Sequence, residues 1–280
     1  MAIFKERQYL RVDVDQERDE SLWMKCKSCG ELVFKRRVRE SNNICPNCGE
    51  YFFHTAMERI ESLVDSGSFV DGAEAIVADD PLGFADSRPY TERIEEAQQK
   101  TGLNDALIFG NASIDSIPVV IAVMDFRFVG GSMGSVVGEQ ICRAIEAAVE
   151  ERRPFILVSS SGGARLQEGL FSLLQMAKTA AVRQRLADAG LPFVSVMTYP
   201  TAGGVLASIA SLGDVIIAER GAMIGFAGRR VIQDTIAQEL PPHFQTDAFA
   251  FEHGFVDRVA KREELRGELA ALLSFFGEAT

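Results

Sequence analysis

The stretch PFILVSSSGGARLQEGL, residues 154–170, joins an apolar run to a pair of glycines and then to a segment with helical character. Residues 155–159 predict a buried strand, and residues 166–189 predict a helix. A strand that breaks at glycines and passes into a helix brings backbone N–H groups to one point, aided by the positive end of the helix dipole. The turn at Gly162 and Gly163 is therefore the first candidate for a functional site.

The pattern of strand, paired glycines and helix recurs further along the chain. Residues 193–197 predict the strand, Gly203 and Gly204 the turn, and residues 204–211 the helix. Repeated units of strand and helix indicate an α/β fold built on parallel strands. In the main body, the remaining predicted elements are a helix over 56–66, a charged helix over 90–101 that ends at Gly102, strands over 106–112 and 117–125 joined by a turn at Asp115 and Ser116, a long helix after the glycines at 130–134, a strand over 214–218, a helix over 230–240, and helices around a short strand within 246–275. Nearer the N-terminus, residues 32–34 predict a short strand and residues 35–37 a turn.

Two common interpretations of such glycine turns do not fit the residues present. No glycine precedes Lys and Ser or Thr in the spacing of a P-loop, and neither GGSMG at 130–134 nor SGGAR at 161–165 matches the dinucleotide fingerprint. A serine nucleophile needs a general base, but the chain has only three histidines, and none of the serines at 159–161 lies in a G-x-S-x-G elbow. The serines at 159–161 are instead expected to cap the turn and the helix.

Backbone N–H groups at the two turns remain as the candidate chemistry. Two such donors can stabilise a developing oxyanion without any catalytic side chain. This suits a reaction that passes through an enolate, for example one on an acyl thioester. The alternative is that the glycines only permit close packing, and the residue pattern alone leaves both interpretations open.

Composition and charge narrow the class of protein. A chain of 280 residues suffices for one large domain with a small appendage. The formal net charge of −11 argues against a general nucleic-acid binder. No apolar run approaches the roughly 20 residues of a membrane span. Residues 1–21 are polar, lack the apolar core of a signal peptide and are expected to be frayed or disordered. We therefore expect a cytoplasmic protein with reduced thiols.

Four of the five cysteines form the pattern C-x2-C, fifteen residues, C-x2-C, which is a strong zinc signal. They are Cys26, Cys29, Cys45 and Cys48, and a glycine follows each pair. Four thiolates complete a tetrahedron with no open position, so the pattern predicts one structural zinc ion per chain. The fifth cysteine, Cys142, lies beside the apolar face of a predicted helix and is expected to fill the core.

The cysteines define a predicted zinc ribbon over residues 22–55, followed by a main domain over residues 56–280. The ribbon has a net charge of +3 between residues 21 and 50, within an acidic chain. A basic surface of this size fits an anionic partner, such as nucleic acid or a phosphorylated cofactor, or else plain solvation. The sequence leaves these possibilities open.

The order of the motifs resembles one known family. CKSCGELVF, CPNCGEYF, TGLNDA, FRFVGGSMGSVVGE, SSSGGARLQEG, YPTAGGVLAS and IGFAGRRVI follow one another between about residues 22 and 260. Together they resemble the β subunit of bacterial acetyl-CoA carboxylase carboxyltransferase. The resemblance implies a crotonase-like α/β fold, a spiral of ββα units, behind a four-cysteine zinc ribbon.

The resemblance also implies a reaction and a set of partners. The reaction moves CO2 from carboxybiotin, held by a separate biotin carboxyl carrier protein, to acetyl-CoA and gives malonyl-CoA for fatty-acid synthesis. The chain would act with a homologous α subunit, typically as an α2β2 core, with acyl-CoA and biotin meeting at the subunit interface. ATP-binding and nucleotide-binding are associated with the whole enzyme, whose biotin carboxylase uses ATP.

For the site, the resemblance implies that backbone groups of Gly163, Ala164, Gly203 and Gly204 stabilise the enolate oxygen of acetyl-CoA. The base would be the ureido nitrogen of biotin, which explains why the sequence offers no catalytic dyad. Arg165 is a candidate for binding the adenine or the phosphates of coenzyme A.

Several points stay open on the sequence alone. An ion pair with Glu168 is an equal alternative for Arg165, and Gly130, Gly131 and Gly134 are expected to shape the site wall. The family pattern leads us to expect proline where this chain has Arg229. Two alternatives to the main interpretation are a carboxyltransferase or decarboxylase for another acyl-CoA and a zinc-ribbon protein that binds nucleic acid.

Overall fold

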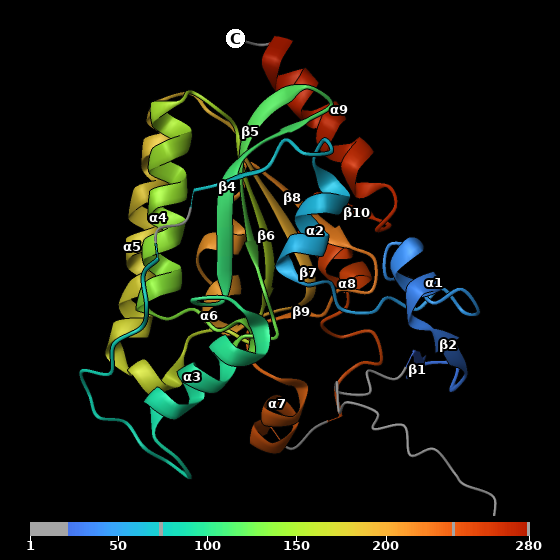
Figure 1. The fold of residues 1–280 in the computed structure, drawn as a ribbon, viewed down its shortest axis with the longest axis vertical. Helices are drawn as coiled ribbons and strands as arrows, with labels where there is room; N and C mark the ends of the chain where they lie inside the picture. Colours follow the sequence, from blue (N-terminus) through green and yellow to red (C-terminus); the bar gives the residue numbers. More distant parts are fainter. Residues whose placement is uncertain (1–21, 73–74, 237–238, 279–280) are drawn as a thin grey trace, which may run out of the picture. The chain divides into compact units, whose positions relative to one another are not determined.

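The computed structural model describes residues 22–72, 75–236 and 239–278. The chain divides into two compact units between Phe52 and Phe53 (Figure 1). The sequence placed this boundary near residue 55. The predicted frayed segment, residues 1–21, lies outside the described residues. The two units are described in turn.

The first unit is a small ribbon around the cysteines. Strand β1 (Trp23–Lys25) pairs antiparallel with β2 (Leu32–Phe34), and the short helix α1 (Lys35–Glu40) follows at once. The sequence predicted the second strand and then a turn, so the helix is a difference. Its buried Val38 joins the small core of the ribbon, which explains why the segment coils instead of turning away.

The second unit is built on one mixed sheet, in which eight strands of the described chain take part. The order is β10-β8-β7-β6-β5-β4-β3, and β9 pairs with β7. β4 and β5 form an antiparallel hairpin, and β5, β6, β7, β8 and β10 run parallel to one another. The strands are β3 (Val70–Asp71), β4 (Leu107–Ile114), β5 (Ile117–Met124), β6 (Phe155–Ser161), β7 (Phe193–Ala202), β8 (Val215–Glu219), β9 (Ile224–Gly225) and β10 (Arg258–Ala260).

Helices cover both faces of this sheet (Figure 1). α4 and α5 lie side by side on one face over the larger apolar core, and α2 and α9 pack over a second core on the other face. The helices are α2 (Ala56–Leu63), α3 (Tyr90–Thr101), α4 (Ser135–Glu150), α5 (Leu170–Asp188), α6 (Gly203–Leu206), α7 (Arg229–Ile236), α8 (Asp247–Glu252) and α9 (Leu265–Glu278), with 3-10 turns η1 (Val129–Gly131), η2 (Leu166–Glu168) and η3 (Ile209–Leu212).

Local signals account for several element ends. Asp115 and Ser116 both have positive φ, 51° and 66°, as a two-residue hairpin turn of type I′ requires, which confirms the predicted turn between β4 and β5. α3 ends at Gly102, whose φ of 74° is the left-handed conformation of a C-terminal cap, also as predicted. Turn chemistry is local, so the sequence alone could supply it.

The decisive stretch differs from expectation in two ways. β6 continues through the three serines to Ser161, and α5 begins only at Leu170 because Gly169, with φ of 53°, interrupts the segment. The serines therefore cap no helix. The Ser159 hydroxyl lies 3.0 Å from the Thr201 hydroxyl on the neighbouring strand, so it is satisfied within the sheet.

No helix in the described part of the chain is both long and apolar enough to cross a bilayer.

Candidate functional site

The four cysteines of the ribbon meet at one point. Their Sγ atoms all lie within 4.8 Å of one another, with 3.7 Å between Cys26 and Cys48 and 4.0 Å between Cys29 and Cys45. A tetrahedral zinc ion with bonds of about 2.3 Å places its sulfur ligands about 3.8 Å apart. The spacing fits zinc and is far longer than a disulfide bond. The ribbon thus holds the complete donor set of a structural zinc ion.

Two matching turns aim these thiols. In each turn the glycine N–H donates to the carbonyl of the first cysteine at 2.9 Å, from Gly30 to Cys26 and from Gly49 to Cys45. The glycines have φ of 76° and 78°, which side chains disfavour. The glycine after each C-x2-C pair is therefore part of the zinc site.

The two glycine turns of the main unit lie against each other at the carboxyl ends of β6 and β7. A Cβ atom on Gly163 would lie 3.1 Å from both Gly203 Cα and Gly204 N. Gly163 also has φ of 119°, and Gly203 has φ of 55°. These positions require glycine for conformation and for close approach. The two glycine turns that were predicted to form the site therefore lie in contact.

Only two of the four predicted N–H groups are available to a ligand. The Gly163 N–H donates to Ser161 Oγ at 3.0 Å, and the Gly203 N–H donates to the Phe226 carbonyl at 3.1 Å. Within the described residues, the N–H groups of Ala164 and Gly204 have no hydrogen-bond acceptor. Gly204 lies in the first turn of α6, where a helix provides no internal partner.

The peptide plane before Ala164 has a defined orientation. The Gly163 carbonyl accepts the Met133 N–H at 2.8 Å. Because a trans peptide is planar, the Ala164 N–H of the same unit points the opposite way, away from Met133. Ala164 is half-buried and Gly162 is exposed, so this donor lies at the edge of the protein surface. The neighbouring N–H groups of Ala164 and Gly204 thus belong to one half-buried and one buried residue.

Arg165 does not face solvent. Its side chain is fully buried and grips Asp105 with two hydrogen bonds of 2.5 and 2.8 Å. Burial lowers the pKa of Arg165, but the charge and hydrogen bonds of Asp105 outweigh burial and hold that pKa above its ordinary value. The expectation that Arg165 contacts coenzyme A does not fit this arrangement, since the guanidinium is already enclosed. The alternative partner, Glu168, lies 3.8 Å away and is secondary to Asp105.

Glu168 and Tyr90 extend this buried cluster; the sequence had suggested Glu168 as an ion-pair partner of Arg165, whereas Tyr90 carried no signal. Glu168 accepts the Tyr90 hydroxyl at 2.7 Å and the backbone N–H of Ser135, the first residue of α4, at 2.6 Å. Burial and the neighbouring carboxylate raise the pKa of Tyr90 despite the opposing charge of Arg165. Tyr90 therefore stays neutral and donates a hydrogen bond. Asp105 lies within the TGLNDA motif, the one hint that sequence provided.

The glycines at 130–134 permit close packing of the wall behind the turns. A Cβ on Gly131 would collide with the Ser160 carbonyl, and one on Gly134 would collide with the Glu168 carboxylate. The Gly130 carbonyl accepts the Gly162 N–H at 2.9 Å. This segment thus supports the site and leaves the donors to the turns.

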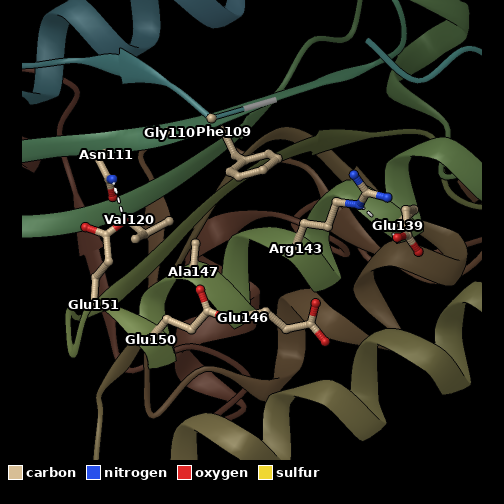
Figure 2. Close-up of a pocket in the computed structure, with 11 residues that line it drawn as sticks. Phe109, Gly110, Asn111, Val120, Glu139, Arg143, Glu146, Ala147, Glu150 and Glu151 are labelled. Atoms are coloured by element: carbon tan, nitrogen blue, oxygen red, sulfur yellow. Dashed lines mark hydrogen bonds and ion pairs between the residues drawn. The ribbon is translucent and has the colours of Figure 1, made fainter. Parts of the chain in front are cut away.

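A separate cleft with a volume of about 480 Å³ lies between β3, β4, β5 and α4 (Figure 2). Its walls hold four glutamates and one arginine, and none of the predicted site residues lines it. Asn111 donates to Glu151 at 2.7 Å and Arg143 to Glu139 at 2.9 Å across its rim (Figure 2). An acidic cleft repels phosphates and carboxylates, so it is a poor match for the acyl-CoA chemistry suggested by the turns.

Known protein domains match both units of the chain. A carboxyl transferase domain matches residues 53–276, and an acetyl-CoA carboxylase zinc finger domain matches residues 23–48. A solved transcarboxylase 12S, with methylmalonyl-coenzyme A and methylmalonic acid bound, superposes with a TM-score of 0.67 at 27% identity, covering 86% of this chain and 44% of that chain. The Pseudomonas malonate decarboxylase MdcD–MdcE hetero-dimer shares the fold, with a TM-score of 0.60 at 24% identity over 80% of this chain and 86% of that one. These matches define a carboxyl transferase domain behind a zinc finger and confirm the predicted crotonase-like fold.

Relatives of nearly full length identify the family more narrowly. The acetyl-coenzyme A carboxylase carboxyl transferase subunit beta of Synechococcus sp. strain WH7803 is 46% identical, covering 98% of this chain and 94% of its own length. The subunit of the same name from Gloeobacter violaceus is 51% identical, covering 92% and 85%. The chain belongs to the family of acetyl-CoA carboxylase carboxyl transferase beta subunits.

Two sequence expectations need separate mention. ATP-binding and nucleotide-binding find no support for this chain, because the matched domains are a carboxyl transferase and a zinc finger and the sequence has no P-loop. The side chain of Arg229, where proline was expected, lies outside the described residues, while the backbone there begins α7.

Proposed function

We propose that this chain is the acyl-acceptor half of a carboxyltransferase that moves CO2 from carboxybiotin to acetyl-CoA and forms malonyl-CoA. The C–N bond of carboxybiotin breaks, a C–C bond forms at the acetyl methyl carbon, and the methyl proton moves to the ureido nitrogen. Removing that proton places negative charge on the thioester oxygen. Family membership and the paired N–H groups of Ala164 and Gly204 support the proposal.

The pair of N–H groups is the observation that carries this function. Both belong to rigid turns, both lack an acceptor within the described residues, and they lie next to each other. Donors that are already oriented stabilise an enolate without reorganisation, and one such donor contributes about 100- to 1,000-fold in rate. We assign the donor role to Ala164 and Gly204. Gly163 and Gly203 provide the backbone conformation that presents them.

A homologous α subunit is the proposed partner, in an α2β2 core. The first half of α5 supports this, because its polarity is inverted. Ser172, Gln175 and Thr179 form its buried face, and their side chains bond to backbone carbonyls of the same helix segment. The exposed face of this half is apolar and consists of Leu170, Phe171, Leu173 and Leu174. Leu166 in η2 extends it, and all five side chains are between 45% and 80% exposed.

A contiguous apolar surface of this kind is typical of a protein interface. We define these five residues as the α5 face. Leu166 follows Ala164 by two positions, so the face is continuous with the proposed site. A chain that covers it also borders the enolate position, which is where the biotin-binding half must lie.

The remaining partners follow from the reaction. Biotin arrives on a biotin carboxyl carrier protein, and biotin carboxylase loads it with CO2 at the expense of ATP. The acyl-CoA class is supported by the transcarboxylase 12S relative, which holds methylmalonyl-coenzyme A. We place the chain in the cytoplasm, where reducing conditions keep four zinc-binding cysteines as thiolates.

Reconstitution tests the proposal. The chain is mixed with an α subunit of the same family and a carboxybiotin donor, and malonyl-CoA is followed with time. We expect turnover only when both chains are present. Rapid malonyl-CoA formation by the isolated chain contradicts the proposal. So does the absence of malonyl-CoA when both chains are mixed with a carboxybiotin donor that is active with another acetyl-CoA carboxylase.

A further inference from the structure

We infer that Arg165 is a positioning residue that orients the Ala164 N–H through Ser132 and Met133. The enolate oxygen as the ligand of this N–H rests on the proposed function. The orientation of the N–H rests on the contacts of four neighbouring segments. Arg165 thus acts from behind the site, on the side away from solvent.

Arg165 is tied to the loop that precedes α4. Its Nη2 donates to the Ser132 carbonyl at 2.8 Å, and its Nε donates to Ser132 Oγ at 3.1 Å. The Ser132 hydroxyl donates in turn to the Val129 carbonyl at 2.8 Å. One planar guanidinium therefore holds both the main chain and the side chain of Ser132.

The next residue of this loop brackets Ala164. The Met133 N–H donates to the Gly163 carbonyl at 2.8 Å, and the Met133 carbonyl accepts the Arg165 N–H at 3.0 Å. These two bonds fix the peptide planes on either side of Ala164. A shift of Met133 therefore rotates the plane that contains the Ala164 N–H.

The guanidinium itself is held from the opposite side. Asp105, 1% exposed, accepts two of its hydrogen bonds, and Nη1 lies 3.2 Å from the Tyr90 hydroxyl. The Phe128 ring lies 5.5 Å from the guanidinium carbon. Partners from α3, from the entry to β4 and from η1 thus enclose Arg165. A lysine has one ammonium group and cannot reproduce this planar set of contacts.

The test compares Arg165→Lys with a matched control, Arg262→Lys. Arg262 is also buried, 5% exposed, and donates to both carboxylate oxygens of Glu219 at 2.9 and 3.0 Å. Both variants lose a buried two-bond ion pair and keep the charge. We expect kcat to fall about 10- to 100-fold in Arg165→Lys with the KM for acetyl-CoA within about twofold, and to stay unchanged in Arg262→Lys.

A binding measurement makes the test independent of turnover. Two coenzyme A thioethers serve as probes of the purified chain assembled with its α subunit: one ends in a nitromethyl group, whose nitronate copies the enolate charge, and the other ends in a neutral ethyl group. We expect Arg165→Lys to weaken the nitro probe about 10- to 100-fold relative to the ethyl probe. Equal weakening of both probes, or equal losses in Arg165→Lys and Arg262→Lys, overturns the inference.

Gentler variants cover the case in which Arg165→Lys fails to fold. Ser132→Ala removes the Nε contact and keeps the guanidinium, and Tyr90→Phe removes one hydroxyl at the far side of the cluster. We expect both to lower the ratio of nitro-probe to ethyl-probe affinity, Ser132→Ala by more. An unchanged ratio in both variants refutes the positioning role. If the wild-type complex forms no malonyl-CoA, the proposed function fails but the positioning role does not, because the ratio of probe affinities is measured without turnover.

Discussion

A Cβ atom built on Gly204 lies 3.4 Å from the backbone nitrogen of Ala164 and 3.2 Å from its Cβ atom. The two residues come from different turns, yet their backbones are as close as the absence of a side chain allows. An enolate oxygen can be shared between their N–H groups only while this space stays open.

Gly204→Val fills that space. We expect kcat for malonyl-CoA formation to fall at least about 100-fold, because the added side chain lies against the Ala164 N–H and blocks one donor. We expect folding to be largely preserved, since the φ of Gly204 lies outside the left-handed region and the nearest heavy atom, Met176 Sδ at 3.1 Å, belongs to a flexible side chain. Gly267→Val is the control, because no heavy atom lies within 4 Å of its Cβ position. Steady-state rates and thermal melts decide, and a normal rate for Gly204→Val rules out the donor role.

A charge on the α5 face is expected to prevent assembly. Leu170→Glu places a carboxylate on the surface proposed to bind the α subunit, and burying it there is unfavourable. We expect affinity for the α subunit to fall more than tenfold, measured by light scattering after gel filtration, with the isolated chain at least as stable as before. Phe275→Glu, at an apolar side chain that is 67% exposed on α9, controls for charge. Normal assembly of Leu170→Glu would exclude the α5 face as the interface.

Acid should weaken the fold partly through Glu219. This carboxylate is 2% exposed and lies 2.7 Å from Arg59 and 2.9 Å from Arg262. Burial raises the pKa of Glu219, but the charge of Arg59 and the hydrogen bonds of Arg262 outweigh it and lower the pKa from 4.5 to about 2. Since the folded pKa is depressed, the stabilisation is complete above pH 4.5 and is lost as pH falls towards 2.

Urea unfolding between pH 7 and pH 3.5 checks this. Glu219→Gln is expected to cost about 3–5 kcal/mol at neutral pH, because it leaves two buried arginines without their carboxylate. The difference from wild type should shrink by up to about 1.4 kcal/mol per pH unit below 4.5. Glu61→Gln, at an exposed carboxylate, should leave the pH dependence unaltered. A pH-independent gap between wild type and Glu219→Gln contradicts the ion cluster.

Zinc removal should unfold the ribbon and spare the main unit. Among the described residues, the apolar core of the ribbon consists of Val33, Val38 and two of the cysteines, with Met24 and Phe52 packed against it, and a core of this size needs a metal ion to fold. A chelator should release one zinc ion per chain and expose amides up to residue 52 to hydrogen exchange. Cys29→Ser should act in the same way, and Cys142→Ala should keep its zinc. Full protection of the ribbon after chelation would disprove a structural zinc.

Patterns that act over short sequence distances were readable in advance. The cysteine spacing, the Asp115–Ser116 hairpin turn and the helix end at Gly102 each depend on a few adjacent residues, and the structure agrees with them. The paired glycines were also readable, because a turn at the end of a strand is a local event. Their meeting in space required the parallel order of β6 and β7.

Contacts between distant segments were not readable. Arg165 and Asp105 are 60 positions apart, and nothing at either position marks the other as its partner. The predicted helix-capping role of the β6 serines was wrong, because Ser159 and Ser160 bond to residues of β7, far along the chain. Ser161 caps the turn as predicted, since its Oγ accepts the Gly163 N–H. Of the four proposed donors, sequence could not separate Ala164 and Gly204 from Gly163 and Gly203, since that choice depends on Ser161 Oγ and the Phe226 carbonyl.

The inverted polarity of α5 also constrains how a cell can make this protein. Copies synthesised in excess of the partner would expose the apolar α5 face to solvent, and exposed apolar surfaces bind chaperones and proteases and aggregate with one another. Balanced synthesis of the two subunits, or binding of the α subunit to this chain during translation, would keep the α5 face covered. The leucines proposed to bind the α subunit would thus also promote aggregation of a chain that lacks its partner.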